Sequence, residues 1–211
     1  MNNLYRSVIF FCATVALTAQ HSVATEDDAI VQYSERAVEL LRDAISRETV
    51  KGQGLVPAYA ESLEQVFLEA GFPPGALTIV PYGETASLVV RYEGDGSSGR
   101  KPILFSSHMD VVPADPDSWL RHPFEFQEDE TFYYGRGVLD NKFDVTILTT
   151  LFVWLKESGF VPNRDLVIAF TGDEETAQET VQQLAGDYRD LVDAEYALVV
   201  DGGGGVLNDA N

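Results

Sequence analysis

The chain has 211 residues, of which 45% are hydrophobic and 23% are charged, a composition typical of a globular domain. Its 34 acidic and 14 basic residues give a formal net charge of -20. This charge repels nucleic acid and anionic membrane surfaces, so we expect neither a nucleic-acid partner nor membrane association of the mature chain. The same acidity also serves solubility alone, and it does not indicate a particular partner.

The N-terminus has the features of an export signal. Arg6 precedes an apolar run from Val8 to Leu17 that is too short to span a bilayer, and Ser22-Val23-Ala24 places small residues where a signal peptidase would cut. We therefore expect export to a periplasm or to the extracellular space. A buried N-terminal helix is the alternative.

We expect cleavage to divide the chain into a signal peptide, residues 1–24, and one domain, residues 25–211. The single cysteine, Cys12, belongs to the predicted signal. The mature chain would therefore have neither a disulfide nor a thiolate metal ligand.

Helices and strands alternate along the predicted domain. Apolar residues at helical spacing predict the helices, and short apolar runs bounded by glycine and proline predict the strands. In chain order we expect helices over 28–46 and 58–70, strands over 77–80, 87–92 and 103–105, a long loop, a helix over 142–158, and strands over 166–170 and 197–200, the last two paired. This alternation indicates an α/β fold with a mixed, mostly parallel central sheet flanked by helices. Ligands of such sheets bind beyond the carboxyl ends of the strands.

Six acidic or histidine residues lie at predicted strand ends or in a loop next to glycines. They are His108, Asp110, Asp140, Glu174, Glu175 and Asp201. An imidazole together with several carboxylates suits zinc or a similar divalent ion.

Two of these groups have an informative spacing. His108 and Asp110 are two residues apart, so on an extended strand both side chains point to one face and the carboxylate can orient the imidazole. Glu174 and Glu175 are adjacent after a strand and should face opposite ways, one toward a metal and the other toward a reacting water. Considered separately, a surface histidine beside an aspartate and an exposed acidic pair in a turn are the better explanations of the two groups.

Three segments in order resemble the motifs of one family. They are Ser107-His108-Met109-Asp110-Val111-Val112-Pro113, Gly135-Arg136-Gly137-Val138-Leu139-Asp140-Asn141-Lys142 and Gly172-Asp173-Glu174-Glu175, with Asp201 as a fourth point. The set resembles the co-catalytic dinuclear zinc metallopeptidases, which include aminoacylases, carboxypeptidase S, carnosinases, acetylornithine deacetylase and succinyl-diaminopimelate desuccinylase. Four motifs in order are more specific than any one of them.

The resemblance implies a role for each of the six residues. His108 and Asp201 would bind one Zn²⁺, Glu175 the second, Asp140 would bridge both, Asp110 would support His108, and Glu174 would be the general base. Co²⁺ or Mn²⁺ could replace zinc. The resemblance also implies a cis peptide bond between Asp140 and Asn141. The implied reaction is hydrolysis of an amide bond in N-acyl amino acids, dipeptides or short peptides with a free carboxylate, by a water held between the ions.

The chain departs from the family pattern in two places. Thr176-Ala177-Gln178 stands where relatives usually have glycine. The family's last zinc ligand, a distant histidine, and its lid domain, which could mediate a homodimer, have no counterpart. We therefore expect the N-terminal portion of a catalytic domain. A metal-binding α/β domain without catalysis and an acidic module without metal are the alternatives.

Three further residues are interpreted as structural. His122, the only other histidine of the mature chain, is expected at the surface, and Arg136 and Lys142 are expected to brace their loop through ion pairs.

Overall fold

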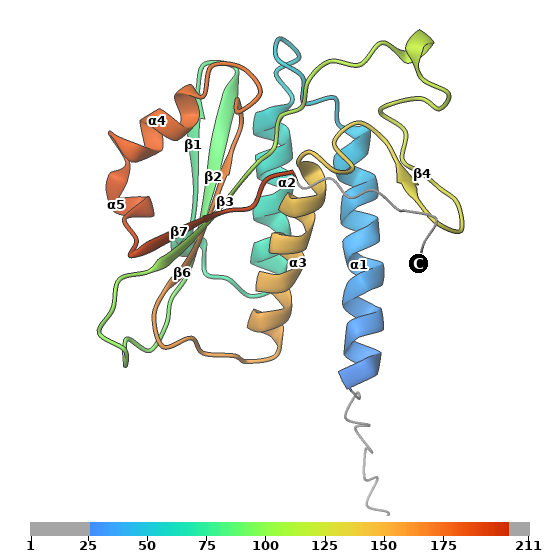
Figure 1. Ribbon diagram of the computed structural model, residues 1–211. Helices are drawn as coiled ribbons and strands as arrows, with labels where there is room; N and C mark the ends of the chain where they lie inside the picture. The colour runs from blue at the N-terminus through green and yellow to red at the C-terminus, as the bar shows by residue number, and fades with distance from the viewer. Residues whose placement is uncertain (1–25, 203–211) are drawn as a thin grey trace, which may run out of the picture.

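The computed structural model describes residues 26–202, so the predicted signal peptide, residues 1–24, lies outside the described part. A central sheet separates two layers of helices (Figure 1). On one face lie α2 (Val56–Glu69) and α3 (Lys142–Glu157), with α1 (Glu26–Ser46) packed against α3. On the other face lie α4 (Glu179–Ala185) and α5 (Arg189–Val192).

The sheet has five strands in the order β1-β2-β6-β3-β7. Their bounds are β1 Leu77–Tyr82, β2 Thr85–Tyr92, β3 Ile103–His108, β6 Leu166–Thr171 and β7 Tyr196–Val199. The pairs β1–β2 and β2–β6 are antiparallel, whereas β3 runs parallel to both β6 and β7. The predicted α/β class with a mixed sheet flanked by helices is confirmed.

One predicted pairing is wrong. We expected the strands near residues 166–170 and 197–200 to be partners, but β3 lies between β6 and β7. The connection from β3 through α3 returns beside β3 and places β6 on one side of it. After α4 and α5, the chain reaches the free edge of β3 on the other side, and β7 pairs there.

Smaller elements were not predicted. The loop after β3 contains a short 3-10 helix, Pro116–Ser118, and the two-stranded hairpin of β4 (Gln127–Glu128) and β5 (Tyr133–Tyr134). A second 3-10 helix, Pro74–Ala76, leads into β1. None of the helices within residues 26–202 has the length and apolar character that crossing a membrane requires.

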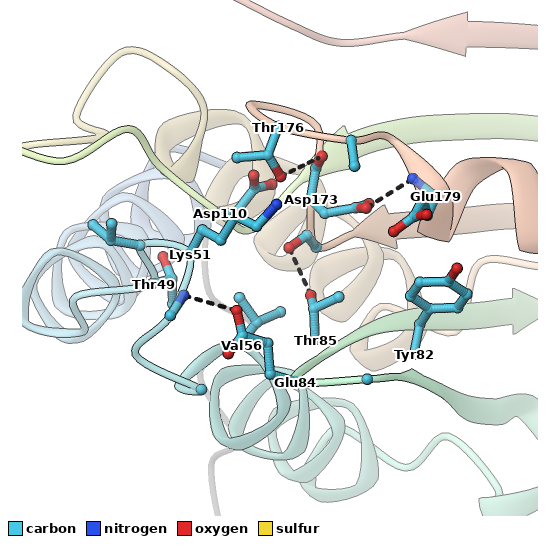
Figure 2. A pocket seen from close by; sticks show the side chains of 16 residues that line it. Thr49, Lys51, Val56, Tyr82, Glu84, Thr85, Asp110, Asp173, Thr176 and Glu179 are labelled. Carbon is cyan, nitrogen blue, oxygen red and sulfur yellow. Dashed lines mark hydrogen bonds between the residues drawn. The ribbon is translucent and has the colours of Figure 1, made fainter.

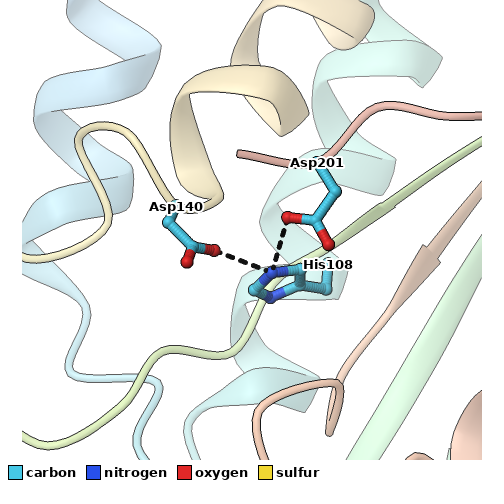
Figure 3. A group of neighbouring side chains, drawn as sticks. All are labelled: His108, Asp140 and Asp201. Atoms are coloured by element: carbon cyan, nitrogen blue, oxygen red, sulfur yellow. Dashed lines mark hydrogen bonds and ion pairs between the residues drawn. The ribbon is translucent and has the colours of Figure 1, made fainter. Parts of the chain in front are cut away.

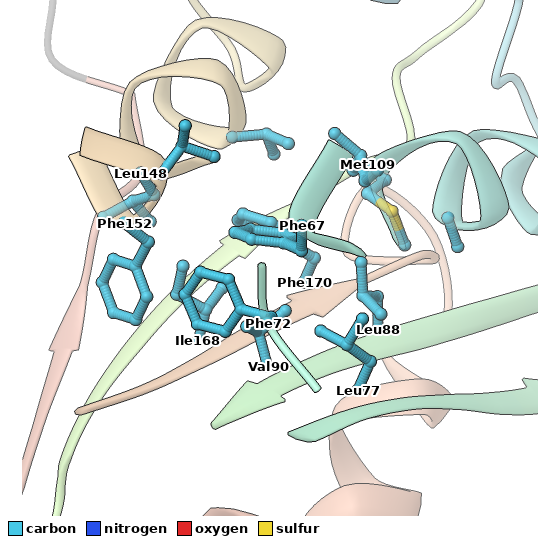
Figure 4. Close-up of a cluster of buried hydrophobic side chains, with 14 of the residues drawn as sticks. Phe67, Phe72, Leu77, Leu88, Val90, Met109, Leu148, Phe152, Ile168 and Phe170 are labelled. Atoms are coloured by element: carbon cyan, nitrogen blue, oxygen red, sulfur yellow. The ribbon is translucent and has the colours of Figure 1, made fainter. Parts of the chain in front are cut away.

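The main core lies between the sheet and the layer of α2 and α3 (Figure 4). Phe67 of α2 and Phe152 of α3 are fully buried against Leu88, Ile168 and Phe170 of the sheet. Burial of aromatic and branched side chains is the main driving force for this packing. It fixes β3 and β6 side by side, with their carboxyl ends at one edge of the molecule.

Candidate metal centre

Three segments that are distant in the sequence bring His108, Asp140 and Asp201 together (Figure 3). His108 is the last residue of β3, Asp140 precedes α3, and Asp201 follows β7. One side-chain nitrogen or oxygen of each lies within 4.8 Å of those of the other two. The His108 Nε2 atom is 3.0 Å from Asp140 Oδ1 and 3.5 Å from Asp201 Oδ1.

Hydrogen bonding sets the orientation of the His108 ring, which is 1% exposed. Nδ1 lies 3.0 Å from the backbone oxygen of Asp110 and 3.3 Å from Asp110 Oδ1. A carbonyl oxygen can only accept a hydrogen bond, so Nδ1 carries a proton. The neutral ring therefore presents the lone pair of Nε2 toward Asp140 and Asp201, which is the arrangement that a metal ligand needs.

Charge around His108 favours its protonated form. Burial alone would lower its pKa, but the hydrogen bond and charge of Asp110, with the charge of Asp201, raise the pKa to about 9. A divalent cation would compete with this proton for Nε2.

The buried carboxylate of Asp110 links β3 to the loop after β6. Its Oδ1 accepts a hydrogen bond from Glu174 N and its Oδ2 accepts one from Glu175 N, each at 3.0 Å. One side chain therefore contacts His108 and holds the backbone of both glutamates.

The two glutamates lie beyond the end of the strand. Strand β6 ends at Thr171, and Glu174 and Glu175 lie in a turn, so the alternation of a strand does not determine their directions. Glu174 Oε2 is 3.9 Å from His108 Nε2. Glu175 is outside the compact three-residue group, but burial and the charge of Asp140 raise its pKa. The carboxyl group of Glu175 is therefore close enough to Asp140 for their charges to interact. The roles of Glu174 and Glu175 stay predictions.

The side chains of Asn141 and Ser107, for which no contact was predicted, connect to the centre. Asn141 is fully buried and donates from Nδ2 to Asp201 Oδ1 at 2.9 Å and to the backbone oxygen of Val200 at 3.0 Å. It accepts a hydrogen bond from Ser107 Oγ at 2.7 Å. The Asp140–Asn141 peptide bond is cis, as the resemblance implies. Both residues belong to the quoted motifs, which is the signal that could have identified them.

The expected ion pair of Lys142 is replaced by another contact. Lys142 is buried, which lowers its pKa to about 7, and its Nζ donates to the backbone oxygens of Ala44 and Arg47 at the end of α1. Carbonyl oxygens in the last turn of a helix lack helical partners and carry partial negative charge. Lys142 therefore anchors the Asp140 loop to α1.

The other two residues interpreted as structural contact aromatic residues of their own loop. The predicted ion pair of Arg136 is not found in the described part of the chain, where its guanidinium instead lies 5.2 Å from the ring centroid of Trp119. His122 is exposed, as predicted, and its Nδ1 accepts a hydrogen bond from Phe124 N.

The loop over residues 172–178 separates two small cavities of about 190 Å³ each. One adjoins the metal centre and is lined by His108, Glu174, Gln178 and Asp201 among others. The second is lined by Thr49, Thr85, Asp110 and Glu179 among others (Figure 2). Asp173 fixes the loop by accepting hydrogen bonds from the backbone of α4. Cavities of this size fit a chemical group of a small substrate better than a macromolecule.

The chemistry of the centre suits a divalent metal. An imidazole nitrogen that faces two carboxylates provides the nitrogen and oxygen donors that zinc binds once the imidazole is deprotonated.

A family model described as peptidase family M20/M25/M40 matches residues 104–210. The chain belongs to this family. The matched region contains all the motifs on which the resemblance was based, so that interpretation is confirmed.

Similar proteins of this family are hydrolases. The human N-fatty-acyl-amino acid synthase/hydrolase PM20D1 is 33% identical over 109 residues, which cover 52% of this chain and 22% of that protein. The probable carboxypeptidase S-like 2 of Dictyostelium discoideum is 40% identical over 90 residues, covering 42% of this chain and 17% of that protein. The chain thus spans about a fifth of the length of these relatives.

Solved structures show the same fold. Human carnosine dipeptidase 1 matches with a TM-score of 0.67 and 20% identity over 83% of this chain and 40% of that one. The di-peptidase Dug1p of Saccharomyces cerevisiae matches with a TM-score of 0.65 and 22% identity, over 82% of this chain and 40% of that one.

Proposed function

We propose that the protein to which this chain belongs is a zinc-dependent hydrolase. Its substrates would be N-acyl amino acids, dipeptides or short peptides with a free carboxylate. The single observation that carries this proposal is the convergence of His108, Asp140 and Asp201, with Nε2 of the histidine directed at both carboxylates. Membership in the M20/M25/M40 family supports it, as do relatives that act on acyl amino acids and peptides.

The residues would divide the work as follows. His108 and Asp201 would hold one zinc ion, Glu175 the other, and Asp140 both. Zinc supplies a Lewis acid that polarises a carbonyl oxygen and makes water more acidic. Asp110 keeps the imidazole of His108 in position through Nδ1.

Glu174 would move the proton. Its carboxylate lines the cavity beside His108 and is about a third exposed, so water and a substrate can reach it. As a general base it would take a proton from the attacking water and then give it to the leaving amine. This transfer allows the C–N bond to break without releasing an amide anion.

Substitution of each glutamate by glutamine, in the complete gene product that carries this chain, tests these roles. We expect Glu174→Gln to lower kcat by about 10²- to 10⁴-fold with zinc per chain unchanged, because only the base is lost. We expect Glu175→Gln to lower both zinc content and turnover.

Zinc per chain and the rate are measured on the same preparations, with N-acetyl amino acids and dipeptides as substrates. Loss of zinc in Glu174→Gln with full zinc in Glu175→Gln would reverse the two assignments. Unchanged turnover in both variants would eliminate the hydrolase proposal.

A further inference from the structure

The side chain of Gln178 contacts the proposed base. Its Nε2 donates a hydrogen bond to Glu174 Oε1 at 2.8 Å, while the other oxygen, Oε2, lies 3.9 Å from His108 Nε2. The two oxygens of Glu174 are therefore not equivalent. One is held by the amide and the other faces the centre. Both side chains line the same cavity as His108.

The backbone at Gln178 is unusual. It has φ 55° and ψ 29°, the left-handed region that glycine adopts at lower cost than other residues. The loop imposes this conformation, because the backbone N–H of Gln178 donates to Asp173 O at 3.0 Å and the Asp173 side chain caps α4. A glycine would adopt this backbone conformation at lower cost, and Gln178 belongs to the segment Thr176-Ala177-Gln178 in which the family pattern usually has glycine.

Stabilisation of α4 does not explain why a glutamine side chain is present at position 178. Gln178 occupies the N-cap position of α4, but its side chain makes no capping hydrogen bond. The polar contact that the structure gives its amide nitrogen is the one to Glu174. A residue with a costly backbone and no capping bond thus directs its amide at the proposed base.

We propose that Gln178 is a positioning residue that holds the Glu174 carboxylate with Oε2 directed at the reacting water. This inference rests on the proposed function. A glutamine amide suits the task because it donates to Oε1 without introducing a charge. Fixing a reacting group in one orientation removes the cost of ordering it in the transition state.

The test replaces Gln178 in the complete gene product by residues that cannot donate this hydrogen bond. Gln178→Gly relieves the backbone, and Gln178→Met keeps the length of the side chain. We expect both to lower kcat about 10-fold with KM and zinc per chain unchanged. The melting temperature of Gln178→Gly should stay the same or rise. Gln182→Met, an exposed glutamine of the same short helix, is the matched control and should keep its kcat.

A double variant separates this role from others. If Gln178 acts through Glu174, Gln178→Gly should cause no further loss of kcat in a Glu174→Gln background. A kcat within 2-fold of the unaltered protein in Gln178→Gly would overturn the inference, as would an equal loss in both backgrounds. In either case a lower kcat of the single variant Glu174→Gln would still support the proposed function. Full turnover in Glu174→Gln would overturn the proposed function itself.

Discussion

The raised pKa of His108 makes metal binding dependent on pH. With a pKa of about 9, the ring is protonated at neutral pH in the metal-free protein, and the proposed zinc ion would have to displace that proton. We expect the apparent zinc affinity to rise by about tenfold per pH unit between pH 6 and pH 8. Competition with a chromophoric chelator measures this, after correction for the chelator's own protonation. An affinity independent of pH would contradict the assigned state of His108.

The same shift affects the stability of the metal-free protein in the opposite direction. The pKa of His108 is higher in the folded state than the ordinary value of 6.5, so protonation stabilises the fold. This contribution is complete below pH 6.5 and is lost as the pH rises through 9. The free energy of unfolding in the presence of a chelator should therefore fall over this range.

Asp110 contributes through hydrogen bonds that an amide cannot reproduce. In Asp110→Asn one oxygen becomes an NH₂ group, which cannot accept the hydrogen bond from Glu174 N or Glu175 N. We expect zinc affinity to fall about 10- to 100-fold. Asp115→Asn is the control, because exposed Asp115 also accepts a backbone hydrogen bond but belongs to a distant turn. Equal zinc affinities of the two variants would show that Asp110 does not organise the centre.

At the scale of elements, the loop between β6 and α4 depends on close approach to β2. A Cβ atom at Gly172 would overlap with the backbone oxygen of Ala86 and with Thr85 Oγ1. We expect Gly172→Ala to lower the free energy of unfolding by about 1–3 kcal/mol, measured by urea denaturation. Gly75→Ala is the matched control, because no heavy atom lies within 4 Å of its added carbon. Equal stability of the two variants would contradict this close packing.

The sequence predicted those elements that have a strong local pattern. The helices α1, α2 and α3 and the five strands of the main sheet follow from helical spacing and short apolar runs. The partner of β7 could not be predicted in this way, because strand pairing depends on crossovers between distant segments. The hairpin of β4 and β5 and the short helices α4 and α5 have too few residues for a clear period.

The candidate site could be predicted only in part. His108, Asp140 and Asp201 were found because histidine and acidic residues at strand ends and in a loop next to glycines matched known motifs. Gln178 was noticed only as a departure from glycine, and its contact with Glu174 depends on a left-handed backbone that no residue pattern indicates.

At the scale of the whole molecule, the net charge of -20 acts against compactness. Added salt screens this repulsion, with a Debye length that falls from about 30 Å at 0.01 M to about 8 Å at 0.15 M. We expect the melting temperature of the metal-free protein to rise over this range of sodium chloride. The exposed ion pairs are weakened at the same time, but each contributes little. A lower melting temperature at higher salt would show that local pairs outweigh the overall repulsion.

The position of β3 between β6 and β7 has a consequence for synthesis on the ribosome. Both neighbours of β3 come later in the chain, so its backbone groups have no partners in this sheet until β6 and then β7 have emerged. His108 is translated early and Asp201 follows the last strand of the sheet, so the group of His108, Asp140 and Asp201 cannot assemble until the sheet can close. A divalent ion held by these residues would therefore lock an assembled sheet but would not guide its first steps, and an unpaired β3 would need protection from aggregation in the meantime.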